Sequence, residues 1–148
     1  MVNRQPVVAL HDVLFRWRRQ AAAVLDIAAF EIAAGERVFL LGPSGSGKST
    51  LLSLIGGVIV PEHGRVFVQG SDLATLSGVA RDRHRAAHLG FVFQMFNLLP
   101  WLSARDNILL PCRFSPARRS RIAADGCTPA AEADRLADQL VARIGDQG

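Results

Sequence analysis

A glycine-rich loop between two apolar segments most constrains what this chain can fold into. Residues 42–49 read GPSGSGKS, which fits the pattern G-x-x-x-x-G-K-[ST]. The preceding run, RVFLL at 37–41, has the composition of a parallel strand buried on both faces. The following run, LLSLIGG at 51–57, predicts a helix that begins near Ser49 and ends at its two glycines. The pattern therefore predicts a strand, a phosphate-binding loop and a helix in succession.

Each residue type in this loop has a chemical reason to be there. The glycines allow positive φ angles and a close approach of the backbone, so that consecutive N–H groups can surround a phosphate. The helix that follows directs its positive end at the same anion. We expect Lys48 to contact the β- and γ-phosphates, Ser49 to ligand Mg²⁺ and Thr50 to support the α- or β-phosphate. The alternative is a purely structural glycine turn. The candidate nucleotide-binding residues are Gly42, Pro43, Ser44, Gly45, Ser46, Gly47, Lys48, Ser49 and Thr50.

The segments around the loop predict an α/β domain. VVALHDVLFRW and AVLDIAAFEI show broken alternation of apolar and polar residues, which favours two or three antiparallel strands before the loop. RVFVQG, at 65–70, predicts one more strand after the helix. LGFVFQ, at 89–94, predicts a second buried strand that ends at Gln94.

Three further helices follow from local signals. A polar, arginine-bearing helix is expected over 78–87. Ser103, with Asp106 three residues later, is a candidate N-cap for a short helix that we expect Pro111 to close. Thr128 followed by Pro129 predicts the start of the last helix.

Composition and charge exclude several classes of protein. A length of 148 residues suits one domain. The apolar stretch at 51–60 is too short for a membrane helix, and the N-terminus lacks a signal-peptide pattern, so we expect a cytoplasmic protein. Cys112 and Cys127 are expected to be free, reduced thiols. Every basic residue except Lys48 is an arginine, which gives little support to a nucleic-acid partner. The arginine clusters are expected to be solvated, with binding of phosphates or lipid headgroups as the alternative.

Three features together resemble the ATP-binding subunits of ABC transporters. The first is GERVFLLGPSGSGKSTLL itself. The second is GFVFQ, whose Gln94 matches the Q-loop glutamine of the family. The third is Trp17 in DVLFRW, at the place where the family usually has a tyrosine that stacks on adenine, with Phe15 as the substitute. FQMFNLLPWLSARDNILLP is further similar to the subgroup that serves lipoprotein release and macrolide export in bacteria. The resemblance extends from Val7 to about Ile144.

The resemblance implies a fold, ligands and partners. The fold is α/β, a P-loop NTPase core with an N-terminal antiparallel β subdomain; these occupy about 1–100, and a helical subdomain begins over about 101–148. The ligands are ATP and Mg²⁺. Gln94 would touch the metal or the attacking water, which makes Lys48 and Gln94 the catalytic candidates and Ser49 and Gln94 the metal candidates. The partners are a membrane permease, which would hold the protein at the inner face of the plasma membrane, and a second copy when the subunit is full length.

The sequence also departs from the family pattern. The second half of the family's domain supplies an LSGGQ signature, an apolar strand ending in Asp-Glu, and a switch histidine, and none of these stands in this sequence. LSG at 76–78 continues with Val-Ala and precedes Gln94, so it does not match the signature. We therefore expect an incomplete domain that lacks the C-terminal part, binds nucleotide weakly at most and is not competent for hydrolysis alone. Exposed sheet edges are expected beside RVFLL.

Two other functions remain open from the sequence. A non-hydrolysing nucleotide-binding or regulatory module would use the same loop. A nucleotide kinase is a more distant alternative, because guanylate-kinase-like enzymes also carry GPSG loops. The 41 residues that precede Gly42 disfavour the kinase, since a small nucleotide kinase typically has its loop near the N-terminus.

Overall fold

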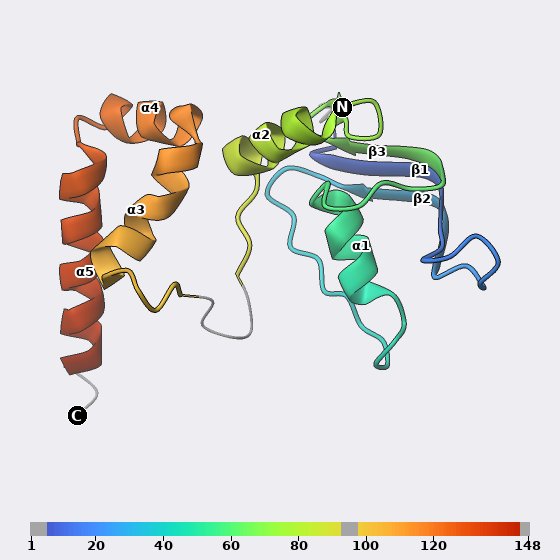
Figure 1. Ribbon diagram of the computed structural model, residues 1–148, viewed down its shortest axis with the longest axis horizontal. Helices are drawn as coiled ribbons and strands as arrows, with labels where there is room; N and C mark the ends of the chain where they lie inside the picture. Colours follow the sequence, from blue (N-terminus) through green and yellow to red (C-terminus); the bar gives the residue numbers. More distant parts are fainter. Residues whose placement is uncertain (1–5, 93–97, 146–148) are drawn as a thin grey trace. The chain divides into compact units, whose positions relative to one another are not determined.

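The computed structural model describes residues 6–92 and 98–145 of the chain (Figure 1). These residues belong to two compact units, Met1–Arg85 and Ala86–Gly148. The first unit contains an antiparallel sheet and the helix that follows the glycine-rich loop, and the second contains three helices. Among the described residues, no helix combines the length and apolar character needed to cross a bilayer.

The sheet of the first unit has four antiparallel strands in the order β2-β1-β3-β4. Leu10 of the central strand β1 pairs with Phe30 of β2 on one side and with Val66 of β3 on the other. Leu10 and Val66 are at most 1% exposed, because alternate residues of these strands face the core. The predicted antiparallel subdomain before the loop is confirmed. The strands are β1 (Val8–Phe15), β2 (Leu25–Ile32), β3 (His63–Val68) and β4 (Ser71–Asp72).

Helix α1 (Lys48–Ile55) packs on this sheet through contacts with β3 (Figure 1). Its residue Leu54 is fully buried. The helix ends where the N–H of Gly56 donates to the carbonyl of Leu52, and Gly57 follows with a φ of +64°. The helix predicted after the loop is thus confirmed, including its end at the two glycines.

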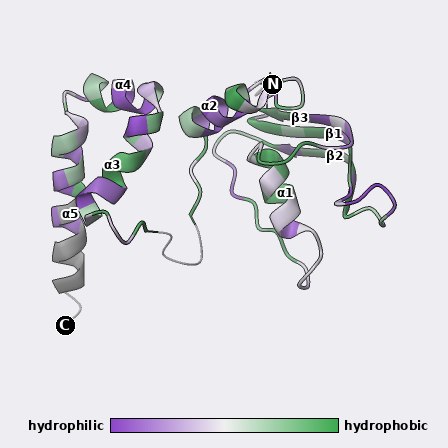
Figure 2. Cartoon of the chain, in the orientation of Figure 1, coloured by the Kyte–Doolittle hydropathy of each residue, from purple (hydrophilic) through white to green (hydrophobic). Residues whose placement is uncertain are grey.

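The two predicted buried strands beside the loop are not formed in the described structure. Residues 37–41 have no strand assignment, and Phe39 and Leu41 are 88% and 89% exposed, although Figure 2 colours the segment after Arg37 as hydrophobic. Residues 89–92 likewise form no strand, and Val92 is fully exposed. The reason is physical: a buried parallel strand needs hydrogen-bonding neighbours, and the four described strands pair only with one another.

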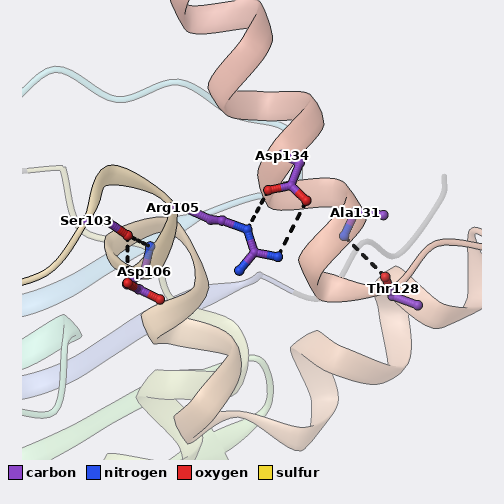
Figure 3. A network of polar contacts seen from close by, with 6 residues as sticks. All are labelled: Ser103, Arg105, Asp106, Thr128, Ala131 and Asp134. Carbon is purple, nitrogen blue, oxygen red and sulfur yellow. Dashed lines mark hydrogen bonds and ion pairs between the residues drawn. The ribbon is translucent and has the colours of Figure 1, made fainter.

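The second unit contains helices whose starts follow the predicted caps (Figure 3). The hydroxyl of Ser103 accepts a hydrogen bond from the N–H of Asp106 at 3.0 Å, and that of Thr128 accepts from the N–H of Ala131 at 3.2 Å. Both predicted starts are confirmed. The helices are α3 (Ala104–Phe114), α4 (Pro116–Ala124) and α5 (Pro129–Gly145), preceded by α2 (Gly78–His88), which begins in the first unit.

Helix α3 does not close at Pro111, as the sequence had suggested, but continues to Phe114. Proline removes one N–H from the helical ladder. The last turn is nevertheless supported from outside, because Arg119 donates to the carbonyl of Cys112 at 2.7 Å and to that of Arg113 at 3.3 Å. These bonds satisfy carbonyls that have no partner inside the helix.

One ion pair joins two helices of this unit, and another lies within a single helix. Arg105 of α3 bonds to Asp134 of α5, which joins the two helices side by side (Figure 3). Glu132 and Arg135 pair within α5. The hydrogen bond from Arg135 lowers the pKa of the Glu132 carboxyl below its usual value. The negative charge of Glu132 also suits its place in the first turn of the helix.

Two arginines of α4 hold the end of α2. Arg118 donates to the carbonyl of Ala86 at 2.8 Å and also to that of Leu89. Arg121 donates to the carbonyl of Ala87 at 2.9 Å. These carbonyls belong to the negative end of a helix, where a cation is favourable. Together with Arg119, these side chains cap helix ends, while Arg113, Arg119 and Arg121 remain exposed as the sequence predicts.

Candidate phosphate-binding site

The loop before α1 has the backbone geometry that the glycines predict. Gly45 and Gly47 have φ angles of +83° and +88°, in the left-handed region that side chains disfavour. Gly47 is the N-cap of α1, and its carbonyl accepts from the N–H of Leu51 at 2.8 Å. Helix α1 has no side-chain cap in the described structure. The N–H groups of its first turn are therefore available as donors to an anion.

The side chain of Lys48 lies across this loop. Its Nζ atom donates to the carbonyl of Gly42 at 2.8 Å, to that of Pro43 at 2.7 Å and to the hydroxyl of Ser46 at 3.2 Å. The ammonium group is thus held by the first two residues of the loop and by Ser46. Carbonyl and hydroxyl oxygens are neutral acceptors, so phosphate oxygens in the same place would form stronger, charge-assisted hydrogen bonds with Lys48.

The remaining loop residues divide into exposed and buried positions. Ser44 and Ser49 are exposed, whereas Thr50 is only 7% exposed. Because Ser49 is exposed in the first turn of α1, its hydroxyl is a candidate ligand for Mg²⁺. The N–H of Ser46 donates to the carbonyl of Pro43 at 3.3 Å, which closes a turn at the tip of the loop. The open backbone, the helix N-terminus and the lysine together fit a polyphosphate with its cation.

The aromatic candidate for base stacking lies just after β1. Trp17 is 62% exposed, and its ring meets that of Phe15 edge to face, with centroids 5.0 Å apart and planes at 88°. Phe15 is only 7% exposed and belongs to the core of the sheet. Of the two aromatic residues, Trp17 is therefore the one with a ring surface that a ligand can reach. Gln94 lies outside the described residues.

The structure adds two residues that the sequence did not single out. Val24 and Leu25, at the start of β2, lie directly against Gly47. This contact joins segments that are far apart in the chain, so no local pattern announces it. The apolar alternation of β2 predicts that Leu25 is buried, but it does not say against what.

Comparison with known proteins finds one matching family model and several similar sequences. A family model described as "ABC transporter" matches residues 25–148. The lipoprotein-releasing system ATP-binding protein LolD of Pseudomonas fluorescens is 39% identical over 126 residues, which are 85% of this chain and 51% of that protein. An uncharacterised ABC transporter ATP-binding protein of Mycobacterium tuberculosis is 44% identical over 112 residues, which are 74% of this chain and 45% of that protein.

The similar solved structures are also ATP-binding cassettes. The ATP-binding cassette MJ0796, in a dimeric post-hydrolysis state bound to ADP and phosphate, is 37% identical with a TM-score of 0.65. The match covers 72% of this chain and 47% of that one. A second dimeric structure of the same cassette has a TM-score of 0.64. The chain thus spans about half the length of the curated relatives and solved cassettes that it matches.

Proposed function

The chain belongs to the ABC transporter family, and on this basis we propose that it binds ATP with Mg²⁺ in the loop at 42–50 as the ATP-binding part of a bacterial transporter. The single observation that carries this proposal is the position of the Lys48 ammonium between the carbonyls of Gly42 and Pro43. The ammonium group lies beside a glycine loop with positive φ angles and the N-terminus of a helix. All three can bind the phosphate oxygens of a nucleotide.

In the proposed complex the chain's own groups bind and orient the nucleotide. The N–H groups of the loop and of the first turn of α1 donate to phosphate oxygens. Lys48 exchanges its carbonyl partners for the β- and γ-phosphates, and Ser49 ligands the magnesium ion. Thr50 supports the α- or β-phosphate, and because Thr50 is buried we expect its main-chain N–H to do so. Trp17 offers its exposed ring to the adenine.

Hydrolysis is a property that we assign to the family's full-length subunit rather than to this chain alone. Lys48 and Gln94 are the proposed catalytic residues, and Gln94 would contact the metal or the attacking water. The sequence has no LSGGQ signature, Asp-Glu strand end or matching switch histidine. Since phosphoryl transfer depends on positioning and charge stabilisation, we expect the chain alone to bind ATP without appreciable turnover.

The proposed partners follow from the relatives. One relative is the ATP-binding protein of a lipoprotein-releasing system, and the cassette MJ0796 forms a dimer. We infer that the full-length subunit pairs with a second copy and docks on a membrane permease at the inner face of the plasma membrane. ATP binding and hydrolysis would then drive transport or extraction at the cell envelope.

Titration calorimetry with Mg-ATP tests the central proposal. Lys48→Ala should weaken ATP binding by about 10-fold to 100-fold, because it removes charge-assisted hydrogen bonds of roughly 1.5–3 kcal/mol. Arg37→Ala is the matched control, since it removes one positive charge from an exposed side chain before the loop. Equal affinity in wild type and the Lys48 variant, or no uptake of Mg-ATP at millimolar concentration, would refute the proposed site.

A further inference from the structure

We propose that Leu25, the first residue of β2, is a positioning residue for the phosphate-binding loop. In this role it acts through Gly47 and sets the direction of Lys48 and of the first N–H groups of α1. The inference rests on the proposed function, since it assigns a part in that same site to a residue that acts through the loop backbone.

The contact between Leu25 and Gly47 is close. A Cβ atom at Gly47 would lie 2.9 Å from Cδ2 of Leu25 and 3.0 Å from the carbonyl oxygen of Val24. Leu25 is 9% exposed, and Gly47 is buried. The start of β2 therefore forms the surface on which the backbone of Gly47 rests.

This surface is where the loop meets the body of the first unit. A Cβ at Gly45 would have no neighbour within 4 Å, and one at Gly42 would meet only Ser46, itself a loop residue. Gly47 is also the N-cap of α1 and precedes Lys48 directly. A shift of Leu25 would thus move the residue from which both the lysine and the helix N-terminus project.

The same contact connects the two ends of the proposed nucleotide site. The N–H of Val24 donates to the carbonyl of Phe15 at 2.9 Å, and the ring of Phe15 contacts that of Trp17. A continuous path therefore runs from Trp17 through Phe15 and Val24 to Gly47. We infer that the beginning of β2 fixes the spacing between the residue that stacks on the base and the loop that holds the phosphates.

Leu25→Ala is the test variant, and Leu10→Ala is its matched control. Leu10 is a fully buried leucine of β1, so its truncation also leaves a cavity in the core of the sheet. Both variants should lower the melting temperature. Only Leu25→Ala should weaken binding of Mg-ATP to the folded protein, by about fivefold or more, because a binding site tolerates only small displacements of its groups. Binding of Mg-pyrophosphate should also weaken, but less than that of Mg-ATP, because the spacing to Trp17 matters only for a ligand with a base.

A second readout does not require a nucleotide. Hydrogen exchange of the amides at 51–55, the first of which donates to the carbonyl of Gly47, should be faster in Leu25→Ala than in Leu10→Ala at the same global stability, adjusted with denaturant. Leu25→Met should restore both the slow exchange and the affinity, since its side chain refills the space next to Gly47. If the alanine variant does not fold, Leu25→Met replaces it as the test variant. If wild type binds no Mg-ATP, the proposed function fails while the exchange comparison still stands. Identical exchange at 51–55 in the two alanine variants would overturn the role of Leu25.

Discussion

Trp17 shows how much a single side chain can contribute at an open site. Its ring contacts Phe15 by its edge and is 62% exposed, so the contact holds the indole without burying it. Trp17→Ala should weaken Mg-ATP binding by about twofold to tenfold, the range expected from an aromatic stacking energy of 0.5–1.5 kcal/mol. Trp17→Phe should keep most of the affinity. Calorimetry with Mg-pyrophosphate is the control, because a ligand without a base should bind the alanine variant normally; an equal loss for both ligands would contradict stacking.

At the residue scale, the sequence predicts the roles of the loop residues but not their hydrogen-bond partners. The positive φ angles of the glycines and the phosphate-binding role of Lys48 could be predicted, because each follows from the chemistry of the residue itself. The bonds of Lys48 to the carbonyls of Gly42 and Pro43 could not, since they depend on how the loop folds back on itself. The contact of Leu25 with Gly47 was also beyond prediction, because it joins two distant segments.

Among the elements, α4 offers a direct test of helix capping by arginine. Arg118 donates to two carbonyls at the end of α2, and both lie in the second unit. Arg118→Gln should destabilise this unit by about 1.5–3 kcal/mol, the range for hydrogen bonds from a charged group. Arg113→Gln, in the exposed last turn of α3, is the control and should have a smaller effect. Hydrogen exchange of the amides of α4 measures the difference, and equal protection in the two variants would count against the capping role.

Local sequence signals were sufficient to predict some helix starts, but not every strand or helix end. The helices that start at Ala104 and Pro129 were predicted, because Ser103 and Thr128 cap them through neighbours three residues away. The strand expected at 37–41 was wrong, because a strand requires a hydrogen-bonding partner and its own sequence does not supply one. The expected end of α3 at Pro111 was wrong for a related reason, since Arg119 of another helix supports the last turn.

For the whole molecule, the apolar run at 37–41 has consequences for its behaviour in solution. Phe39 and Leu41 are nearly fully exposed and stand two positions apart in a β-prone run that has no strand assignment. Such a run presents unpaired backbone groups and apolar side chains to other chains, which favours self-association.

The double substitution Phe39→Ser and Leu41→Thr should therefore reduce association of the purified chain. Light scattering at increasing protein concentration measures the effect, and we expect the onset of scattering to move to a concentration at least about twofold higher. Val79→Ser is the control: Val79 is 62% exposed but stands alone on a helix, so its substitution should change the onset little. Binding of Mg-ATP should survive the double substitution, because the hydrogen bonds that hold Lys48 go to Gly42, Pro43 and Ser46. An unchanged onset in the double variant would show that association has another origin than residues 37–41.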